Sequence, residues 1–79
     1  MKIDVLFFGL TADLTGSRSI EIEVGKRATA SEVLDTIIEQ HPALIPHRIL
    51  IAVNEEYVPL ETVIRDGDEL AMFTAVSGG

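Results

Sequence analysis

The sequence predicts a two-layer α+β domain in which one main helix covers one face of a mixed sheet of four or five strands. Three observations lead to this prediction. Several segments alternate between two faces as strands do, and one segment has the periodicity of an amphipathic helix. The chain has 79 residues, which provides one small core and therefore one domain over residues 1–79.

The first two strands are expected at residues 2–8 and 19–24. In both segments the side chains alternate with the period of two that a strand requires. Residues 9–16 begin and end with glycine and form a connector with room for a helical turn. The side chains expected on the core face are Ile3, Val5 and Phe7 from the first strand and Ile20, Ile22 and Val24 from the second.

The main helix is expected to begin near Thr29. Thr29 and Glu32 fit a capping box, in which each side chain bonds a free amide group at the start of a helix. Pro42 cannot be accommodated inside a helix, so the helix should end near His41. The residues that form its apolar stripe are Val33, Leu34, Ile37 and Ile38.

The second half of the chain is predicted to contain three strands. Residues 43–48 are expected to be a loop, and the unbroken apolar run 49–53 is typical of a buried strand. The apolar pattern leaves open which face of this strand meets the helix. Residues 57–58 form a short edge strand that ends at a proline. After a compact connection and a tight turn at 66–67, the last strand begins at Glu69 and alternates.

One helix can cover only one face of the sheet, so the other face should be open. The alternation places Leu6, Phe8 and Phe73 on this open face. In a two-layer domain with this order of elements we expect the two terminal strands to pair, which would bring Phe8 and Phe73 together, with Tyr57 on the nearby edge. Exposed aromatic side chains grouped in this way are typical of a protein interface. The alternatives are that the 9–16 connector covers them or that they are scattered apolar surface.

Charge and composition exclude several classes of partner. Six Lys and Arg against 13 Asp and Glu give a net charge of −7, which repels nucleic acid and anionic membranes. There is no run of about 20 apolar residues to span a membrane. We therefore expect a cytoplasmic protein without a nucleic-acid or membrane partner.

No metal site is expected. The chain contains no cysteine, which excludes disulfides, thiolate metal sites and a cysteine nucleophile. His41 and His47 do not have the spacing of metal ligands, and the acidic residues are dispersed over turns and surface positions.

The remaining candidate for chemistry is the closing pair Gly78-Gly79. Glycine has no β-carbon, so such a tail can enter a narrow channel and adopt backbone angles closed to other residues. Adenylation by ATP would give the Gly79 carboxyl a good leaving group, and its carbonyl would be unhindered toward a sulfur or amine nucleophile. The alternative is an added or frayed end without a role.

The whole sequence resembles the β-grasp sulfur carriers (MoaD/ThiS-like), and within them the small, sulfur carrier subunits of molybdopterin synthase (MoaD-type). The motifs that carry the resemblance, in chain order, are Val5-Leu6-Phe7-Phe8, Leu14-Thr15-Gly16, the segment 52–58, Asp66-Gly67-Asp68-Glu69 and Val76-Ser77-Gly78-Gly79. The resemblance implies a ubiquitin-like β-grasp fold in which residues 75–79 form a flexible, protruding tail.

The resemblance also implies a role for Gly79 in building the molybdopterin dithiolene. A ubiquitin-activating-enzyme-like adenylyltransferase would adenylate Gly79 with ATP, and a sulfurtransferase would supply sulfur, leaving a thiocarboxylate (1-thioglycine). The thiocarboxylate would donate sulfur to cyclic pyranopterin monophosphate in the large subunit, within a heterotetramer of two small and two large subunits. The carrier would have no catalytic side chains and no tightly bound cofactor. Val76, Ser77 and Gly78 would thread into the partner, and Leu6, Phe8, Tyr57 and Phe73 would form the partner interface.

Two other functions remain open. The first is a thiamine-pathway or other thiocarboxylate carrier, although such carriers are typically shorter between the helix and the third strand than the Gln40–Arg48 segment here. The second is a ubiquitin-like modifier or binding module, in which Gly79 would form an isopeptide bond or stay unmodified.

Overall fold

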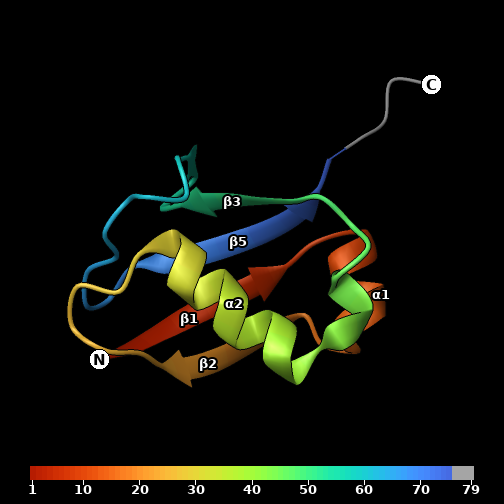
Figure 1. Ribbon diagram of the computed structural model, residues 1–79, viewed down its shortest axis with the longest axis horizontal. Coiled ribbons are helices and arrows are strands. Elements are labelled where there is room, and N and C mark those ends of the chain that lie inside the picture. The colour runs from red at the N-terminus through yellow and green to blue at the C-terminus, as the bar shows by residue number, and fades with distance from the viewer. Residues whose placement is uncertain (76–79) are drawn as a thin grey trace.

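Five strands in the order β2-β1-β5-β3-β4 form one sheet, and helix α2 lies across one of its faces (Figure 1). The structure is a computed structural model that describes residues 1–75. It confirms the predicted two-layer α+β architecture. The elements are β1 (Lys2–Phe7), α1 (Leu10–Thr15), β2 (Ser19–Glu23), α2 (Ala30–Gln40), the 3-10 turn η1 (Pro42–Leu44), β3 (Ile49–Val53), β4 (Glu56–Tyr57) and β5 (Glu69–Thr74).

The first and last strands lie side by side at the centre of the sheet. β1 and β5 are parallel, with Leu6 opposite Ala71, whereas β2 pairs with β1, and β3 with β5, in antiparallel fashion. β4 is a two-residue edge strand beside β3. The sheet is therefore mixed, and the predicted pairing of the terminal strands is confirmed.

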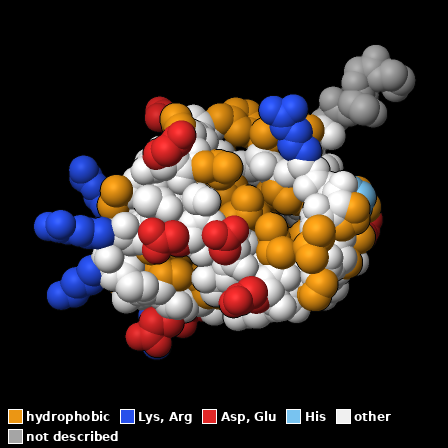
Figure 2. All heavy atoms as spheres, viewed as in Figure 1, with side chains coloured by type: hydrophobic (Ala, Val, Ile, Leu, Met, Phe, Trp, Pro, Cys, Tyr) orange, Lys and Arg blue, Asp and Glu red, His pale blue; other side chains and the backbone are white. Residues whose placement is uncertain are grey.

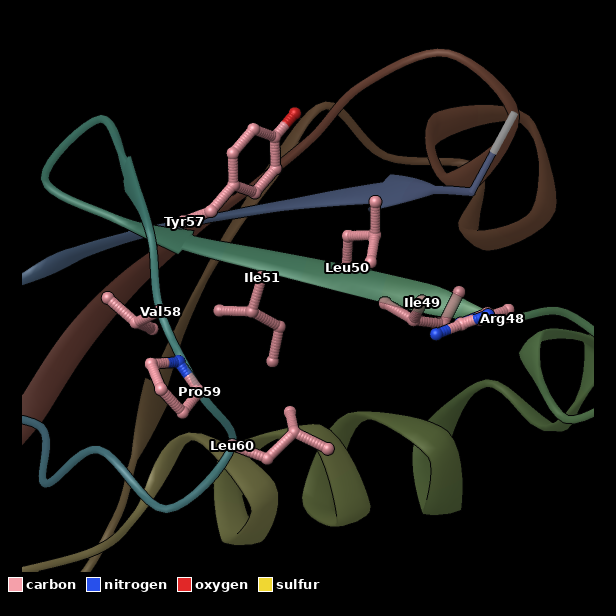
Figure 3. A pocket seen from close by; sticks show the side chains of 8 residues that line it. All are labelled: Arg48, Ile49, Leu50, Ile51, Tyr57, Val58, Pro59 and Leu60. Carbon is pink, nitrogen blue, oxygen red and sulfur yellow. The ribbon is translucent and has the colours of Figure 1, made fainter. Parts of the chain in front are cut away.

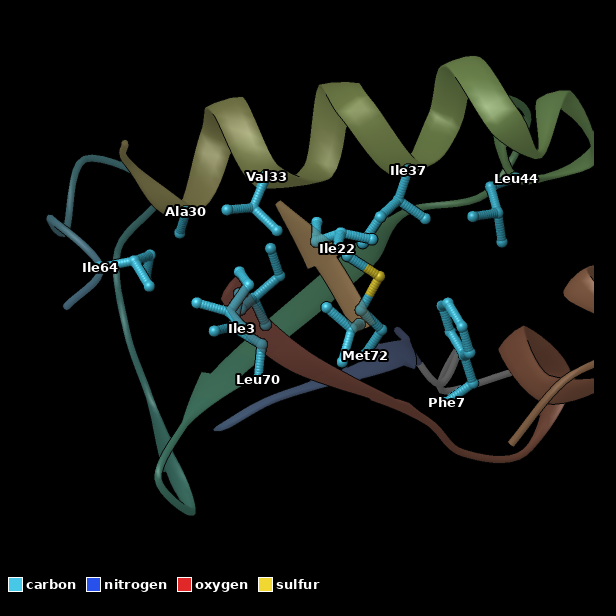
Figure 4. Packing of buried hydrophobic residues seen from close by; sticks show 12 residues of the cluster. Ile3, Phe7, Ile22, Ala30, Val33, Ile37, Leu44, Ile64, Leu70 and Met72 are labelled. Atoms are coloured by element: carbon cyan, nitrogen blue, oxygen red, sulfur yellow. The ribbon is translucent and has the colours of Figure 1, made fainter. Parts of the chain in front are cut away.

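The core fills the space between α2 and the sheet (Figure 4). Val33 and Ile37 of the predicted helical stripe are completely buried, whereas Leu34 and Ile38 are half-buried at its margin. Alternation predicted this face correctly, since every side chain expected to point inward from the first two strands belongs to the core or packs against it. The buried cluster consists of Ile3, Val5, Phe7, Ile22, Ala30, Val33, Ile37, Leu44, Ile51, Ile64, Leu70 and Met72.

Helix α2 begins and ends where the sequence predicts. The Thr29 side chain accepts a hydrogen bond from the Glu32 amide at 3.2 Å, and Thr29 has the extended backbone of an N-cap. At the other end, the amide of His41 bonds back to the carbonyl oxygen of Ile37 at 2.9 Å. Pro42 follows and starts the separate turn η1.

Five details of the sequence prediction are wrong. The first strand ends at Phe7, the second strand ends at Glu23 instead of at residue 24, and β4 covers residues 56–57 instead of 57–58. The 43–48 loop includes the end of η1, because proline at the start of a short helix loses no hydrogen bond, and Leu44 is fully buried there. The 49–53 strand is not buried on both faces, because Leu50 points to the open face and is 36% exposed.

The outer surface on the α2 side mixes acidic and hydrophobic side chains, while most of the visible Lys and Arg side chains gather at the end where the N-terminus lies (Figure 2). Within residues 1–75, neither α-helix combines the length and hydropathy of a bilayer-spanning segment.

Candidate functional site

Three aromatic rings meet on the face of the sheet opposite α2. The rings of Phe8 and Phe73 are stacked, with centroids 5.1 Å apart and planes at 8°. The ring of Tyr57 leans against Phe73 at 5.9 Å and 58°. Together with the neighbouring Leu6 these side chains line one groove, and we call the four residues the aromatic surface. The structure thus brings together all four residues that the sequence predicts for the partner interface.

Strand register explains this grouping. Phe73 of β5 lies opposite Leu50 of β3, and Leu6 of β1 lies opposite Ala71 of β5. Tyr57 reaches the same face because its partner across the β3–β4 pair is Ala52. The groove between them has a volume of about 330 Å³ and is lined by Leu6, Phe8, Ala52, Glu55, Tyr57, Glu69, Ala71 and Phe73.

The connector does not cover the aromatic surface, so that alternative is wrong. Phe8 is 45% exposed and Tyr57 69% exposed. Helix α1 instead packs beside β5 and η1 at one end of the sheet. Exposed rings on a sheet face without a covering helix are suited to docking another protein.

Phe8 is held in place by Thr11, a buried residue that sequence reasoning missed. The Thr11 hydroxyl accepts a hydrogen bond from the Phe8 amide at 3.0 Å, and its oxygen lies 2.8 Å from the carbonyl oxygen of Phe8 and 3.0 Å from that of Met72. Since a hydroxyl donates one proton, the two carbonyls share it. Thr11 thereby ties the end of β1 to β5. The only sequence feature that points to a structural role for Thr11 is its position after a glycine-containing turn, and this feature is too common to be specific.

Gly9 lets the chain turn away from the sheet directly after Phe8. Its φ of 57° and ψ of −128° lie where residues with a β-carbon are strained. The turn places α1 against the end of the sheet and leaves the Phe8 ring on the open face. The backbone conformation therefore favours glycine at this position, where a β-carbon would otherwise have open space.

A second hollow of about 350 Å³ lies along β3 and residues 57–60 and shares Tyr57 with the first groove (Figure 3). Ile51 and Leu60 point into the space between β3 and α2, whereas Tyr57 and Leu50 point to the opposite side of the sheet. This difference confirms that Leu50 belongs beside the aromatic surface, which the unbroken apolar pattern of its strand had concealed.

The β3–β4 turn is fixed to the start of β5 by Asn54. The Asn54 side chain donates to Asp68 Oδ1 at 2.9 Å and accepts from the Glu69 amide at 3.1 Å. Asn54 and Glu55 have left-handed φ values of 49° and 71°, which a two-residue hairpin turn requires. This anchorage sets the position of Tyr57, which follows two residues after the turn.

The predicted tail, Val76, Ser77, Gly78 and Gly79, lies outside the described residues. The last described contact before it is a hydrogen bond from the Ala75 amide to the Arg48 carbonyl oxygen at 2.9 Å. Because β5 ends at Thr74, directly after Phe73, the aromatic surface lies at the end of the sheet from which the tail continues.

Both histidines make contacts that belong to the fold. The His41 ring packs edge-on against Phe7, with centroids 6.3 Å apart, at the end of α2. His47 is half-buried and its amide bonds to the carbonyl oxygen of Leu44. Among residues 1–75 no group of three or more His, Cys, Asp or Glu is arranged to hold a metal ion.

Comparison with known proteins identifies close relatives over the whole chain. The molybdopterin synthase sulfur carrier subunit of Homo sapiens is 36% identical, with 99% of this chain and 94% of the relative covered. Small archaeal modifier protein 1 of Haloferax volcanii is 34% identical, with 91% and 94% covered. The crystal structure of SAMP1 from Haloferax volcanii superposes with a TM-score of 0.87 over 100% of both chains.

The fold and the family are both shown by these matches. The complex of subunits 1 and 2 of the molybdopterin-converting factor from Helicobacter pylori contains a chain that is 26% identical, with a TM-score of 0.68 and 100% of both chains covered. The expected β-grasp fold is confirmed, because a ubiquitin also matches the full chain. The model of the ThiS family matches residues 5–79, and the chain therefore belongs to the ThiS family.

Proposed function

We propose that this chain is the sulfur carrier subunit of molybdopterin synthase and that Gly79 carries the sulfur. The observation that carries the proposal is the position of the aromatic surface at the end of β5, next to the start of the Val76–Gly79 tail. A partner that docks on this surface is placed to receive the tail. Family membership and a relative named molybdopterin synthase sulfur carrier subunit support the same role.

The only group that the carrier has to supply for this chemistry is a free carboxyl at Gly79. In the first step its oxygen attacks the α-phosphorus of ATP, pyrophosphate leaves, and an acyl adenylate forms. The terminal sulfur of a persulfide on the sulfurtransferase then attacks the carbonyl carbon and AMP leaves, which gives an acyl disulfide. A thiol attacks the donor's sulfur in this disulfide, so that the donor leaves as a disulfide with that thiol and the thiocarboxylate remains on Gly79. Glycine at 78 and 79 leaves this carbon unhindered. The carrier itself needs no catalytic side chain for either step.

The proposal assigns three partners. An adenylyltransferase that resembles ubiquitin-activating enzyme consumes ATP, and a sulfurtransferase supplies the sulfur. The large subunit of molybdopterin synthase takes the thiocarboxylate and passes sulfur to cyclic pyranopterin monophosphate, in an assembly of two carriers and two large subunits. The Helicobacter pylori complex of subunits 1 and 2 supports a large-subunit partner. We assign the reaction to the cytoplasm because activation consumes ATP.

The test is an intact-mass measurement of the chain ending at Gly79, after incubation with the cognate adenylyltransferase, ATP and a sulfur source. We expect one oxygen to be replaced by sulfur, and fragmentation should place the change at Gly79. The modified carrier and the large subunit should then convert cyclic pyranopterin monophosphate to molybdopterin. A chain lacking Gly78-Gly79 is the matched control. Sulfur transfer by this control would refute the proposal.

A second function is favoured by the similarity to small archaeal modifier protein 1. A modifier would use the same adenylate, but a lysine amine would displace AMP to form an isopeptide bond. Conjugates of this chain with other proteins, detected on a blot and lost when Gly78-Gly79 is deleted, would support that function. If the thiocarboxylate instead serves thiamine synthesis, the molecule that accepts its sulfur would be a thiamine precursor and not cyclic pyranopterin monophosphate, and identifying that acceptor would distinguish the two functions.

A further inference from the structure

A row of acidic side chains crosses the same sheet face beside the aromatic surface. Asp4 of β1 lies directly opposite Glu21 of β2 on one side and Glu69 of β5 on the other. All three residues are exposed. Residues directly opposite in an antiparallel pair have β-carbons about 4.5–5.5 Å apart, and neighbouring strands of a sheet lie about 4.7–4.9 Å apart, so three carboxylates stand next to one another. We call Glu21, Asp4 and Glu69 the acidic row.

The acidic row does not help the isolated domain to fold. Like charges placed directly opposite on neighbouring strands destabilise a sheet. Among residues 1–75, the one ion pair joins Lys2 Nζ to Glu21 Oε1 at 3.9 Å and involves neither Asp4 nor Glu69. The three carboxylates also do not belong to any arrangement able to hold a metal ion within that part of the chain. For Asp4 and Glu69, which form no ion pair among residues 1–75, a partner surface can supply the positive charge.

The acidic row and the aromatic surface form one continuous face. Leu6 and Ala71 are opposite each other in the row of residues adjacent to Asp4 and Glu69, and the stacked rings of Phe8 and Phe73 follow in the next row. Glu69 lines the same groove as Phe8 and Phe73, together with Glu55 from the β3–β4 turn. The face therefore changes from acidic to aromatic along β1 and β5, toward the end where the tail begins.

We infer that this face docks a partner whose apolar patch is bordered by a row of Lys or Arg side chains, and that the acidic row sets the orientation in which the tail enters the partner. The inference rests on the proposed function, which makes the large subunit of molybdopterin synthase the partner. Charge at the border of an apolar interface acts mainly on the association rate and on orientation, because it steers the encounter before the apolar groups meet. The net charge of −7 makes a basic partner surface the complementary one.

The test compares two double variants that remove the same charge from opposite faces. Asp4→Asn with Glu69→Gln removes the two carboxylates of the acidic row that form no ion pair and leaves Glu21, while Asp35→Asn with Glu39→Gln removes two exposed carboxylates from α2. Association with the cognate large subunit is measured by stopped flow at several salt concentrations. We expect the acidic-row variant to associate about 3- to 10-fold more slowly at low salt, with a weaker dependence on salt, and the α2 variant to associate nearly as the unmodified chain does.

Three outcomes are distinguishable. If the unmodified chain binds but both variants show the same small change, net charge alone explains the effect and the inference is wrong. If the unmodified chain neither binds the large subunit nor supports molybdopterin formation with it, the proposed function is wrong.

A thermal melt separates folding from binding, since the acidic-row variant should melt at a higher temperature than the unmodified chain. A lower melting temperature would show that the acidic row stabilises the domain, and the inference would then be refuted.

Discussion

Replacing Phe73 by alanine is expected to weaken binding to the large subunit by about 30-fold while the domain stays folded. Phe73 is the central ring of the aromatic surface, 5.1 Å from the Phe8 ring and 5.9 Å from the Tyr57 ring. Truncating a central aromatic residue of an interface costs at least about 2 kcal/mol of binding free energy, which corresponds to this loss of affinity. The change also removes the ring contacts that hold the side chains of Phe8 and Tyr57 in the positions where a partner would contact them.

The effect on folding should be smaller than the effect on binding. Each aromatic pair contributes about 0.5–1.5 kcal/mol beyond the area that it buries, and these pairs lie on an open face. We therefore expect the free energy of unfolding to fall by about 1–2 kcal/mol, with a decrease in melting temperature of roughly 4–8 °C per kcal/mol in a domain of this size. Cooperative unfolding should be retained.

The assay is calorimetric titration of the large subunit, with urea unfolding of the same preparations. Leu60→Ala is the matched control, because Leu60 is 42% exposed but its side chain points into the space between β3 and α2, away from the aromatic surface. If Phe73→Ala and Leu60→Ala change the dissociation constant equally, the aromatic surface is not the docking site. If Phe73→Ala unfolds the domain, Phe73 belongs to the core and the assignment of faces is wrong.

Three further predictions concern single features of the structure. Thr11→Val should lower the free energy of unfolding by about 1 kcal/mol in urea, because the Phe8 amide retains the Met72 carbonyl oxygen at 3.2 Å as an acceptor. A loss above about 3 kcal/mol would contradict that reasoning. Leu44→Ala should cost about 2–5 kcal/mol, since this side chain is fully buried, and a loss below about 1 kcal/mol would place η1 outside the core. Deleting Gly78-Gly79 should leave the melting temperature unchanged and abolish sulfur transfer, so a clear drop in melting temperature would show that these residues support the fold.

Much of the open face could be predicted because alternation is a local property of a strand. Leu6 and Phe8 fall on the face opposite Ile3, Val5 and Phe7 wherever the strand is placed in the sheet. The capping residues of α2 are likewise local, since Thr29 and Glu32 interact within one turn. These signals were sufficient to separate the core from the exposed face.

For other residues, no local sequence pattern indicates whether the side chain is buried or exposed. The run 49–53 is apolar throughout, so nothing in it distinguishes exposed Leu50 from buried Ile51. Leu44 lies between two prolines, a pattern typical of a loop, yet it is buried because η1 contacts both α1 and α2. The burial of Thr11 depends on the carbonyl oxygen of Met72, which is 61 residues away in the chain.

The sequence by itself determined the elements, the core face and the composition that excludes cysteine chemistry, because periodicity and composition depend only on neighbouring residues. Only the tertiary structure decided the complete strand order and the register between the strands. The parallel pairing of β1 with β5 stacks Phe8 on Phe73 and also places Asp4 beside Glu69. Both results depend on register between segments more than 60 residues apart, and register is set by the packing of the whole sheet against α2.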